Sequence, residues 1–182
     1  MKFSTGLVTV LSFATVAFSN PIKRDVNQVK ADIANIAAKV TALDNAITAF
    51  PLTGGTLLAA LGIHNSAVAL DDTLKAATTN VISTGVVGDA DGLDIINAVS
   101  AFSPNIDHAL SEIVVKKPAF VALPIGGLPA LIYQDLNKLQ ASTDGYATAL
   151  VNNAPSSLTA DAVALKAAAL AGFPAAIAAY AP

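Results

Sequence analysis

The feature that most constrains this 182-residue sequence is an apolar repeat that starts at residue 26 and continues for about seven helical turns. Apolar residues recur there at intervals of three and four: Val26, Val29, Ile33, Ile36, Val40, Leu43, Ile47 and Phe50. This spacing places them on one face of an α-helix of roughly 39 Å, which Pro51 and Gly54-Gly55 end. A chain that begins in this way must bury one long helical stripe against further elements.

The same helical rhythm returns in later segments. It predicts helices over residues 56–83, from Asp89-Ala90-Asp91-Gly92 to the stop at Lys116-Lys117-Pro118, over 128–150, and from Ser157 or Thr159 onward. Ser103-Pro104 either kinks the third helix or starts a new one, and Pro174 should bend the last. No alternating strand pattern or Asn-Gly hairpin turn is found. We therefore predict an all-α fold: one domain over residues 25–182, a bundle of four to five long amphipathic helices.

The residues before this domain are typical of an exported protein. Lys2 precedes an apolar run over residues 7–18, and Ala17-Phe18-Ser19 fits a small-x-small cleavage site. We expect a signal peptide over residues 1–19, cleaved after Ser19, because the run is too short to span a membrane. Lys23-Arg24 then predicts a short dibasic pro-segment over residues 20–24 and a mature start at Asp25. The predicted location is extracellular.

Charge and motif content exclude several classes of function. Residues 25–182 contain seven basic and thirteen acidic residues, a net charge of -6, and no Arg, which argues against nucleic acid and anionic lipid headgroups as partners. With no cysteine, no catalytic motif, and His64 and His108 on separate predicted helices, we expect no catalytic residues, no cofactor and no enzyme activity. Asp89-x-Asp91-x2-Asp94 lacks the glycine and glutamate positions of a calcium loop, so no metal site is predicted.

The apolar surplus is the unusual property of the chain. Hydrophobic residues make up 54% of the sequence and charged residues only 13%, and 12 of the 23 residues from Ala160 to Pro182 are alanine. Small side chains on packing faces could leave an internal channel, or they could bring the helices into close contact. The residues alone leave both interpretations open.

Several patterns together resemble a known family. They are Lys23-Arg24-Asp25 after the signal peptide, Val29-x2-Asp32-Ile33-x2-Ile36-x3-Val40-x2-Leu43-Asp44-x2-Ile47, Pro104-x-Ile106-x2-Ala109-Leu110, and Ile113-x2-Lys116-Lys117-Pro118-x-Phe120. In these respects the chain resembles the fungal hydrophobic-surface-binding protein A family, which includes the cell wall galactomannoproteins. The resemblance covers essentially all of residues 25–182. The patterns are apolar rather than catalytic signatures.

The resemblance implies a secreted, non-enzymatic helical bundle that binds fatty acids or similar lipids, adsorbs to hydrophobic surfaces, or does both. It also implies secreted hydrolases or wall polysaccharide as further partners, and a structural or adhesive role in the fungal cell wall, without a lipid pocket, is the alternative. Some members carry Ser/Thr-rich stalks or anchors; we interpret residues 167–182 as the last bundle helix and expect a secreted form with no transmembrane span. An esterase-like enzyme is a distant third hypothesis.

Candidate ligand-binding residues lie on the predicted stripes near the middle of each helix, where a channel would run. They are Val40, Leu43, Ile47, Leu61, Val68, Ile96, Phe102, Leu136 and Leu139. Each could instead belong to a plain core. His64, beside the second stripe, could meet a ligand carboxylate.

Overall fold

The structure of the protein is a computed structural model that describes residues 25–124 and 126–182. The predicted signal peptide and the processing residues Ser19, Lys23 and Arg24 lie outside this part of the chain. The described residues form α1 (Val26–Ala49), α2 (Leu57–Thr84), α3 (Asp89–Val115), α4 (Lys117–Val121), α5 (Leu128–Asn152), the 3₁₀ turn η1 (Ser156–Leu158), α6 (Thr159–Leu170) and α7 (Phe173–Tyr180). No strand occurs among them, so the all-α prediction is confirmed.

Helix α1 shows how the apolar stripe determines the fold. The side chain of Asp25 accepts a hydrogen bond from the Asn27 amide and caps the first turn. Of the eight predicted stripe residues, all but Val26 are buried, with exposures of 2% to 7%. Helix α2 begins similarly, with the Thr56 hydroxyl accepting from the Ala59 amide.

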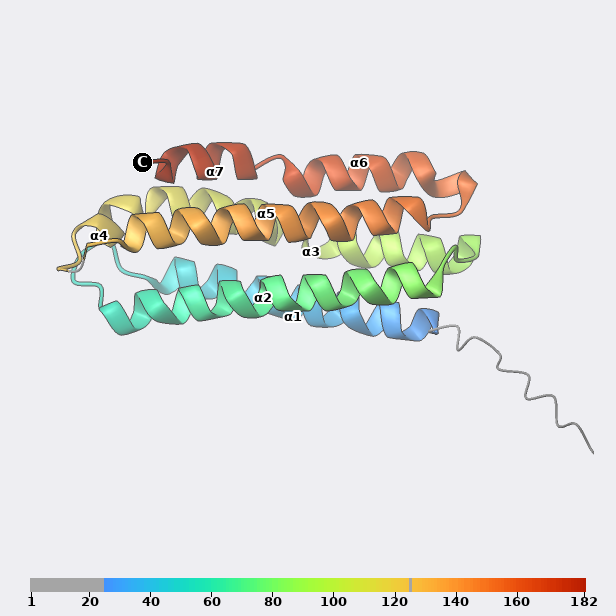
Figure 1. Ribbon diagram of the computed structural model, residues 1–182, viewed down its shortest axis with the longest axis horizontal. Helices are drawn as coiled ribbons and strands as arrows, with labels where there is room; N and C mark the ends of the chain where they lie inside the picture. The colour runs from blue at the N-terminus through green and yellow to red at the C-terminus, as the bar shows by residue number, and fades with distance from the viewer. Residues whose placement is uncertain (1–24, 125) are drawn as a thin grey trace, which may run out of the picture.

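The contacts between helices arrange them as a ring of five positions around a common axis. Helix α1 packs against α2 and α3, α2 packs against α5, and the α6–α7 segment fills the gap between α5 and α3. Helices α2 and α5 run in one direction, and α1, α3 and α6–α7 run in the other (Figure 1). The last segment of the chain therefore closes the ring.

Two prolines have different effects on the helices. Helix α3 continues through Pro104 as a single helix, so the predicted second helix start at Ser103 is not found. The Ser103 hydroxyl donates instead to the Val99 carbonyl, 3.1 Å away. Pro174 lies in the first turn of α7, where a missing amide costs nothing, and the chain breaks just before it at Gly172. A Cβ at Gly172 would lie 2.9 Å from Leu110 Cδ1, so glycine is needed for this close approach.

The Lys116-Lys117-Pro118 motif follows the end of α3 and links it to the ends of α1 and α7. Helix C-termini leave backbone carbonyls unpaired and favour a nearby cation. The Lys116 amine donates to the Thr48 and Phe50 carbonyls at the end of α1, at 3.0 and 2.7 Å. The Lys117 amine donates to the Ala179 carbonyl at the end of α7. The Phe50 and Phe120 rings stack beside this junction, with centroids 4.3 Å apart.

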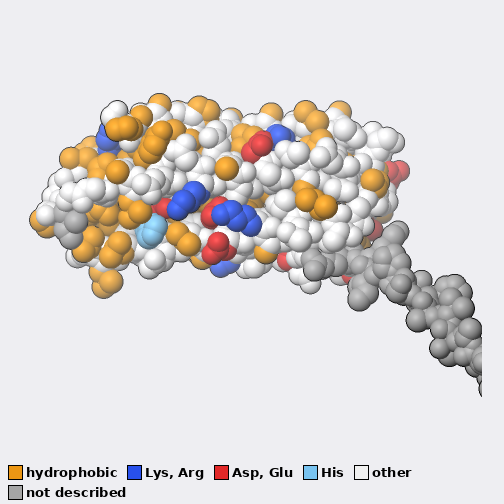
Figure 2. Space-filling model, in the orientation of Figure 1, with side chains coloured by type: hydrophobic (Ala, Val, Ile, Leu, Met, Phe, Trp, Pro, Cys, Tyr) orange, Lys and Arg blue, Asp and Glu red, His pale blue; other side chains and the backbone are white. Residues whose placement is uncertain are grey.

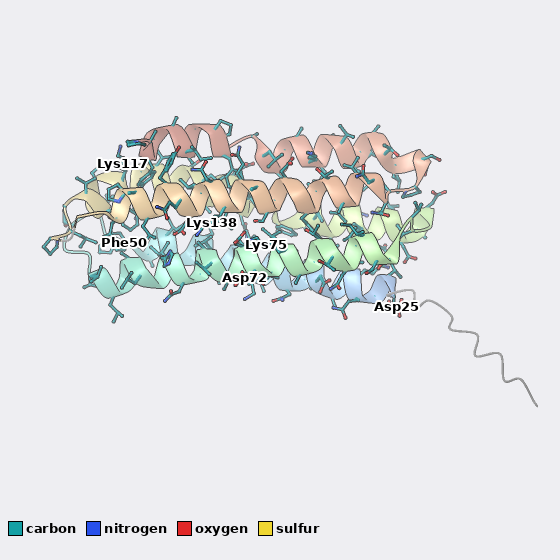
Figure 3. The ribbon with its side chains drawn as sticks, viewed as in Figure 1. Asp25, Phe50, Asp72, Lys75, Lys117 and Lys138 are labelled. Carbon is teal, nitrogen blue, oxygen red and sulfur yellow. The ribbon has the colours of Figure 1, made fainter. Side chains whose placement is uncertain are left out.

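Charge is distributed unevenly along the bundle. Residues 45–70, 118–134 and 167–182 contain no Asp, Glu, Lys or Arg, and they meet at the end formed by the α1–α2 loop, α4 and α7. Hydrophobic side chains gather at this end, at the left of Figure 2. Asp25 lies at the other end, and Asp72, Lys75 and Lys138 lie near the middle (Figure 3). We call this end, at which Lys116 and Lys117 also lie, the apolar end.

One described segment, Ser156–Tyr180, is long and apolar enough to cross a membrane by length and composition alone. Its most apolar stretch has a mean hydropathy of 1.7, and 22% of that stretch is buried. In this structure the segment includes η1, α6 and α7, which pack against α3 and α5. Its hydropathy comes largely from alanine, and most of the segment is unburied because only one face of α6 and α7 packs against the bundle.

Candidate functional site

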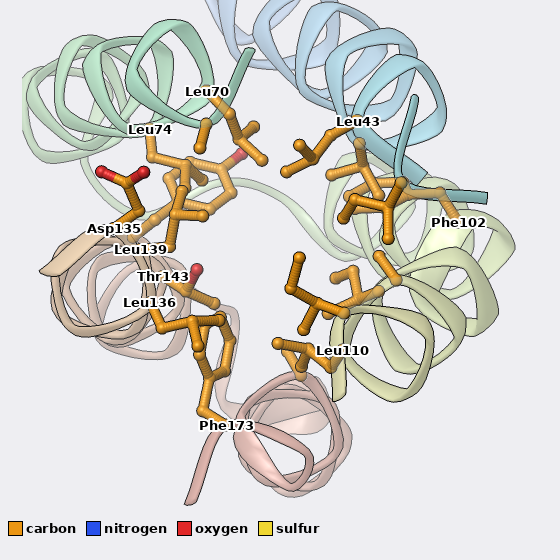
Figure 4. A pocket seen from close by; sticks show the side chains of 18 of the residues that line it. Leu43, Leu70, Leu74, Phe102, Leu110, Asp135, Leu136, Leu139, Thr143 and Phe173 are labelled. Carbon is orange, nitrogen blue, oxygen red and sulfur yellow. The ribbon is translucent and has the colours of Figure 1, made fainter. Parts of the chain in front are cut away.

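The centre of the ring is a cavity of about 130 Å³ lined by side chains from all five ring positions (Figure 4). Five helices leave more central space than four. With neighbouring axes about 10 Å apart, the centre lies about 8.5 Å from each axis in a pentagon but about 7 Å in a square. Because a helix with its side chains has a radius of about 5 to 6 Å, five helices leave a channel of about 3 Å in radius.

Alanine enlarges this central space. Six of the lining residues are alanine, and they come from four of the five ring positions: Ala60, Ala67, Ala109, Ala147, Ala162 and Ala169. Larger aliphatic and aromatic side chains complete the wall, among them Leu43, Leu70, Phe102 and Phe173 (Figure 4). Of the two interpretations of the alanine content, the structure favours an internal channel around the ring axis.

The cavity has the length of an acyl chain. Its lining on α2 extends from Ala60 to Leu74 and on α5 from Leu128 to Leu150, which correspond to about 21 and 33 Å of helix. An extended sixteen-carbon chain, with bonds of about 1.5 Å, is about 20 Å long. The narrow channel and its length together suit one unbranched apolar chain.

Most of the residues predicted from the sequence line this cavity. Val40, Leu43, Ile47, Ile96, Phe102, Leu136, Leu139 and His64 all do so. Leu61 and Val68 do not: Leu61 is 37% exposed and Val68 is half-buried. Each follows a buried alanine, Ala60 or Ala67, and one residue turns a helix by about 100°. The lining face of α2 is therefore the one that carries Ala60 and Ala67, together with larger residues such as Leu70.

His64 is not free to meet a ligand through its Nδ1 atom. That nitrogen lies 2.7 Å from Oδ2 of Asp135, which joins α2 to α5 at the cavity wall. Asp135 is 7% exposed, and its Oδ1 atom has no hydrogen-bond partner among the described residues. Burial raises the pKa of the Asp135 carboxyl above its ordinary value, while the hydrogen bond with His64 opposes the increase.

A second group of polar side chains lines the cavity further along α5. Thr143 points its hydroxyl toward the cavity (Figure 4), and Tyr146 follows three residues later. Tyr146 is 5% exposed, and its hydroxyl has no partner among the described residues. Burial raises the pKa of this hydroxyl, so it stays protonated and able to donate. Sequence reasoning missed both residues; their position on the predicted stripe of this helix was the available signal.

The remaining ionisable groups give no sign of a metal centre. Among residues 25–124 and 126–182, no three His, Asp or Glu side chains are grouped so that they could hold a metal ion. His108 instead lies 2.6 Å from Asp44 on the outer surface, and this hydrogen bond raises the pKa of His108. Lys30 bridges Asp91 and Asp94 at 2.8 and 2.7 Å, close to the start of α3.

Comparison with solved structures gives two protein domains of the same fold. In AfMp4p, solved in complex with palmitic acid, 27% of aligned residues are identical, the TM-score is 0.79, and the match covers 86% of this chain and all of that one. Ligand binding domain 1 of the Penicillium marneffei MP1 protein, solved with arachidonic acids, shares the fold at a TM-score of 0.77 and 20% identity, over 86% of this chain and 99% of that one.

Sequence comparison gives two fungal relatives and one family. Cell wall mannoprotein 1 of Aspergillus flavus is 28% identical over 168 residues and that of Aspergillus fumigatus 27% identical over 167. Each match covers 92% of this chain, which spans only 58% and 56% of the two relatives. Residues 26–152 match the family described as hydrophobic surface binding protein A. Because this match spans well over half of the chain, the protein belongs to the hydrophobic surface binding protein A family.

Proposed function

We propose that the protein is a non-catalytic carrier that binds a long-chain fatty acid or a similar lipid in its central cavity. The observation that carries the proposal is the apolar channel inside the five-position ring, lined by aliphatic and aromatic side chains over the length of an acyl chain. The likeness to AfMp4p, solved with palmitic acid at 27% identity, supports it.

The energetics of burial are compatible with such a ligand. Each buried CH2 group contributes about 0.8 kcal/mol, so a sixteen-carbon chain offers roughly 12 kcal/mol. Association costs about 4 to 15 kcal/mol in lost translational and rotational freedom, and a preformed channel adds little to this because the side chains that line it are already ordered. The eight predicted residues that line the channel would bind the acyl chain through this apolar contact.

Native mass spectrometry of the secreted, undelipidated protein tests the proposal. We expect a discrete added mass of a few hundred daltons that organic extraction releases as a fatty acid or related lipid. A bare protein that also fails to bind added palmitate in calorimetry would refute the carrier function. If the protein does not bind palmitate but does bind another lipid, the carrier function stands and only the identity of the ligand changes.

The apolar end favours a second activity, adsorption to hydrophobic surfaces. Leu52, Leu58 and Val121 are 60%, 81% and 57% exposed there, within segments that carry no charge. Because the protein contains no Trp, Leu58→Trp gives a single fluorescent reporter. We expect its emission to shift to shorter wavelength on polystyrene beads. Val86→Trp, at a position 67% exposed near the other end, is the matched control and should not shift. Equal shifts would contradict adsorption through the apolar end.

The relatives named cell wall mannoprotein support a secreted protein that acts outside the cell or at the fungal wall. A structural wall role without a lipid ligand is the alternative, and secreted hydrolases or wall polysaccharide are candidate partners. Immunogold labelling of intact hyphae, combined with assay of the culture medium, tests the location. Retention inside the cell would contradict it.

A further inference from the structure

We propose that the ligand binds in one orientation, with its carboxylate on the Thr143 and Tyr146 hydroxyls and its hydrocarbon tail directed toward Asp135. This inference rests on the proposed carrier function, since it concerns a fatty acid in the same cavity. It adds a headgroup subsite to a cavity whose lining is mostly apolar. It also moves the polar contact away from His64, the residue that the sequence suggested.

The first argument is the pair of hydroxyls. Thr143 and Tyr146 are three residues apart on α5, so they are neighbours on one helix face, with Cβ atoms about 5 to 6 Å apart. Both line the cavity, and the Thr143 hydroxyl points toward it (Figure 4). The Tyr146 hydroxyl is buried and unpaired among the described residues. A buried donor without a partner is costly, and a ligand carboxylate could accept from both groups.

The second argument is the distribution of charge along the cavity. Lys166 of α6 also lines it, and its amine lies 2.7 Å from the Thr148 hydroxyl and 2.8 Å from Asp144. These two partners come just before and just after Tyr146 in sequence, so the lysine lies at the level of the two hydroxyls. The Lys166 cation offsets the negative charges of Asp144 and of Asp32, which is near enough to raise the pKa of Tyr146, and so permits an anionic headgroup at this level.

Asp135 lies nearer the start of the same helix. It precedes Thr143 by eight residues, or about 12 Å along the axis. Its Oδ1 atom is a buried acceptor without a partner among the described residues, and a ligand carboxylate, which only accepts, could not satisfy it. Beyond Asp135 the lining continues through Ile132, Leu131 and Leu128 to Phe120, which are all apolar. This end therefore suits the methyl terminus.

The proposal predicts which ligands a hydroxyl deletion affects. In the double variant Thr143→Val with Tyr146→Phe, both substitutions keep the shape of the side chain and remove only the oxygen. We expect the affinity for palmitate, measured by calorimetry on the delipidated secreted protein, to fall at least tenfold. The affinity for methyl palmitate, which has no anionic headgroup, should change less than threefold. Tyr180→Phe is the control. It removes a hydroxyl that does not line the cavity and already donates to the Ile113 carbonyl, 2.7 Å away, so the affinity for palmitate should not change.

The outcomes separate this subsite from the carrier function itself. If the wild-type protein binds neither ligand, the carrier function fails. If the wild-type protein binds palmitate and the double variant loses both ligands equally, or loses neither, the headgroup subsite is refuted. A stearic acid with a nitroxide at its methyl end provides a second measurement. It should broaden the amide signals of Phe120 and Leu128 more than those of Ala147 and Leu150, and the reverse pattern would overturn the orientation.

Discussion

The substitution of one cavity-lining alanine by leucine tests whether the central space is a real void. Ala67 and Ala77 both lie on α2 and are both buried, with exposures of 5% and 1%. Ala67 lines the cavity and Ala77 does not. The same change at the two positions therefore compares a void with a packed core, at equal helix propensity.

The expected free energies have opposite signs. At Ala67 the three added carbons would be buried in existing space, which stabilises by about 0.8 kcal/mol each. The lost side-chain entropy of leucine costs about 0.5 to 1 kcal/mol, so the net gain is about 1.5 to 2 kcal/mol. At Ala77 the added carbons have no room, and overpacking costs about 1 to 3 kcal/mol.

Urea unfolding of the delipidated protein, followed by circular dichroism, measures both effects. With a slope of about 2 kcal/mol per molar urea, the midpoint should rise by about 1 M in Ala67→Leu and fall by about 0.5 to 1.5 M in Ala77→Leu. The affinity for palmitate should decrease only in Ala67→Leu, because the new side chain occupies the channel. If both variants are destabilised alike and Ala67→Leu still binds palmitate normally, the channel does not exist as described.

Three further predictions concern groups outside the cavity. Lys116→Met should lower the free energy of unfolding by about 1.5 to 3 kcal/mol in urea titration, because the amine hydrogen-bonds carbonyls at the end of α1, and an unchanged midpoint would contradict that role. Gly55→Ala should destabilise by about 1 to 3 kcal/mol, since its Cβ would lie 2.5 Å from Phe50 Cζ; a melting temperature equal to wild type would show that the ring moves freely. The pKa of His108, followed by NMR, should fall in Asp44→Asn, and an unchanged pKa would contradict the hydrogen bond. In the wild-type protein, the stability that this pair contributes should be present below about pH 6.5 and should disappear as the pH rises through the raised pKa of His108.

The fold could be predicted because the spacing of apolar residues in each long helix indicates which face is buried. The α1 stripe from Val29 to Phe50 is buried as expected, and Pro51 comes directly after the helix end. The path through Pro104 was less predictable, because a proline inside a helix removes one hydrogen bond but does not prevent continuation when both flanking segments are packed. The residues around Pro104 do not indicate that both flanking segments of α3 are packed.

The site could be predicted only in part, because the cavity depends on positions where small side chains leave space. Choosing large residues near the middle of each stripe identified Leu43 and Leu136 but also Leu61, which faces away. The decisive residues on α2 are Ala60 and Ala67, whose small size is indistinguishable in sequence from close helix packing. The ring order that brings α6–α7 between α3 and α5 is a long-range property, which periodicity within one helix cannot reveal.

The closure of the ring by its last segment has a consequence for biosynthesis. A chain emerges from the ribosome starting at its N-terminus, so α1, α2, α3 and α5 are available before α6 and α7 exist. Without α6 and α7 the cavity would be a trough open between α3 and α5, with its aliphatic wall exposed to water. A lipid could then enter sideways, without the threading that a closed channel requires. Exchange of a ligand in the finished protein is therefore expected to depend on how often α6 and α7 detach.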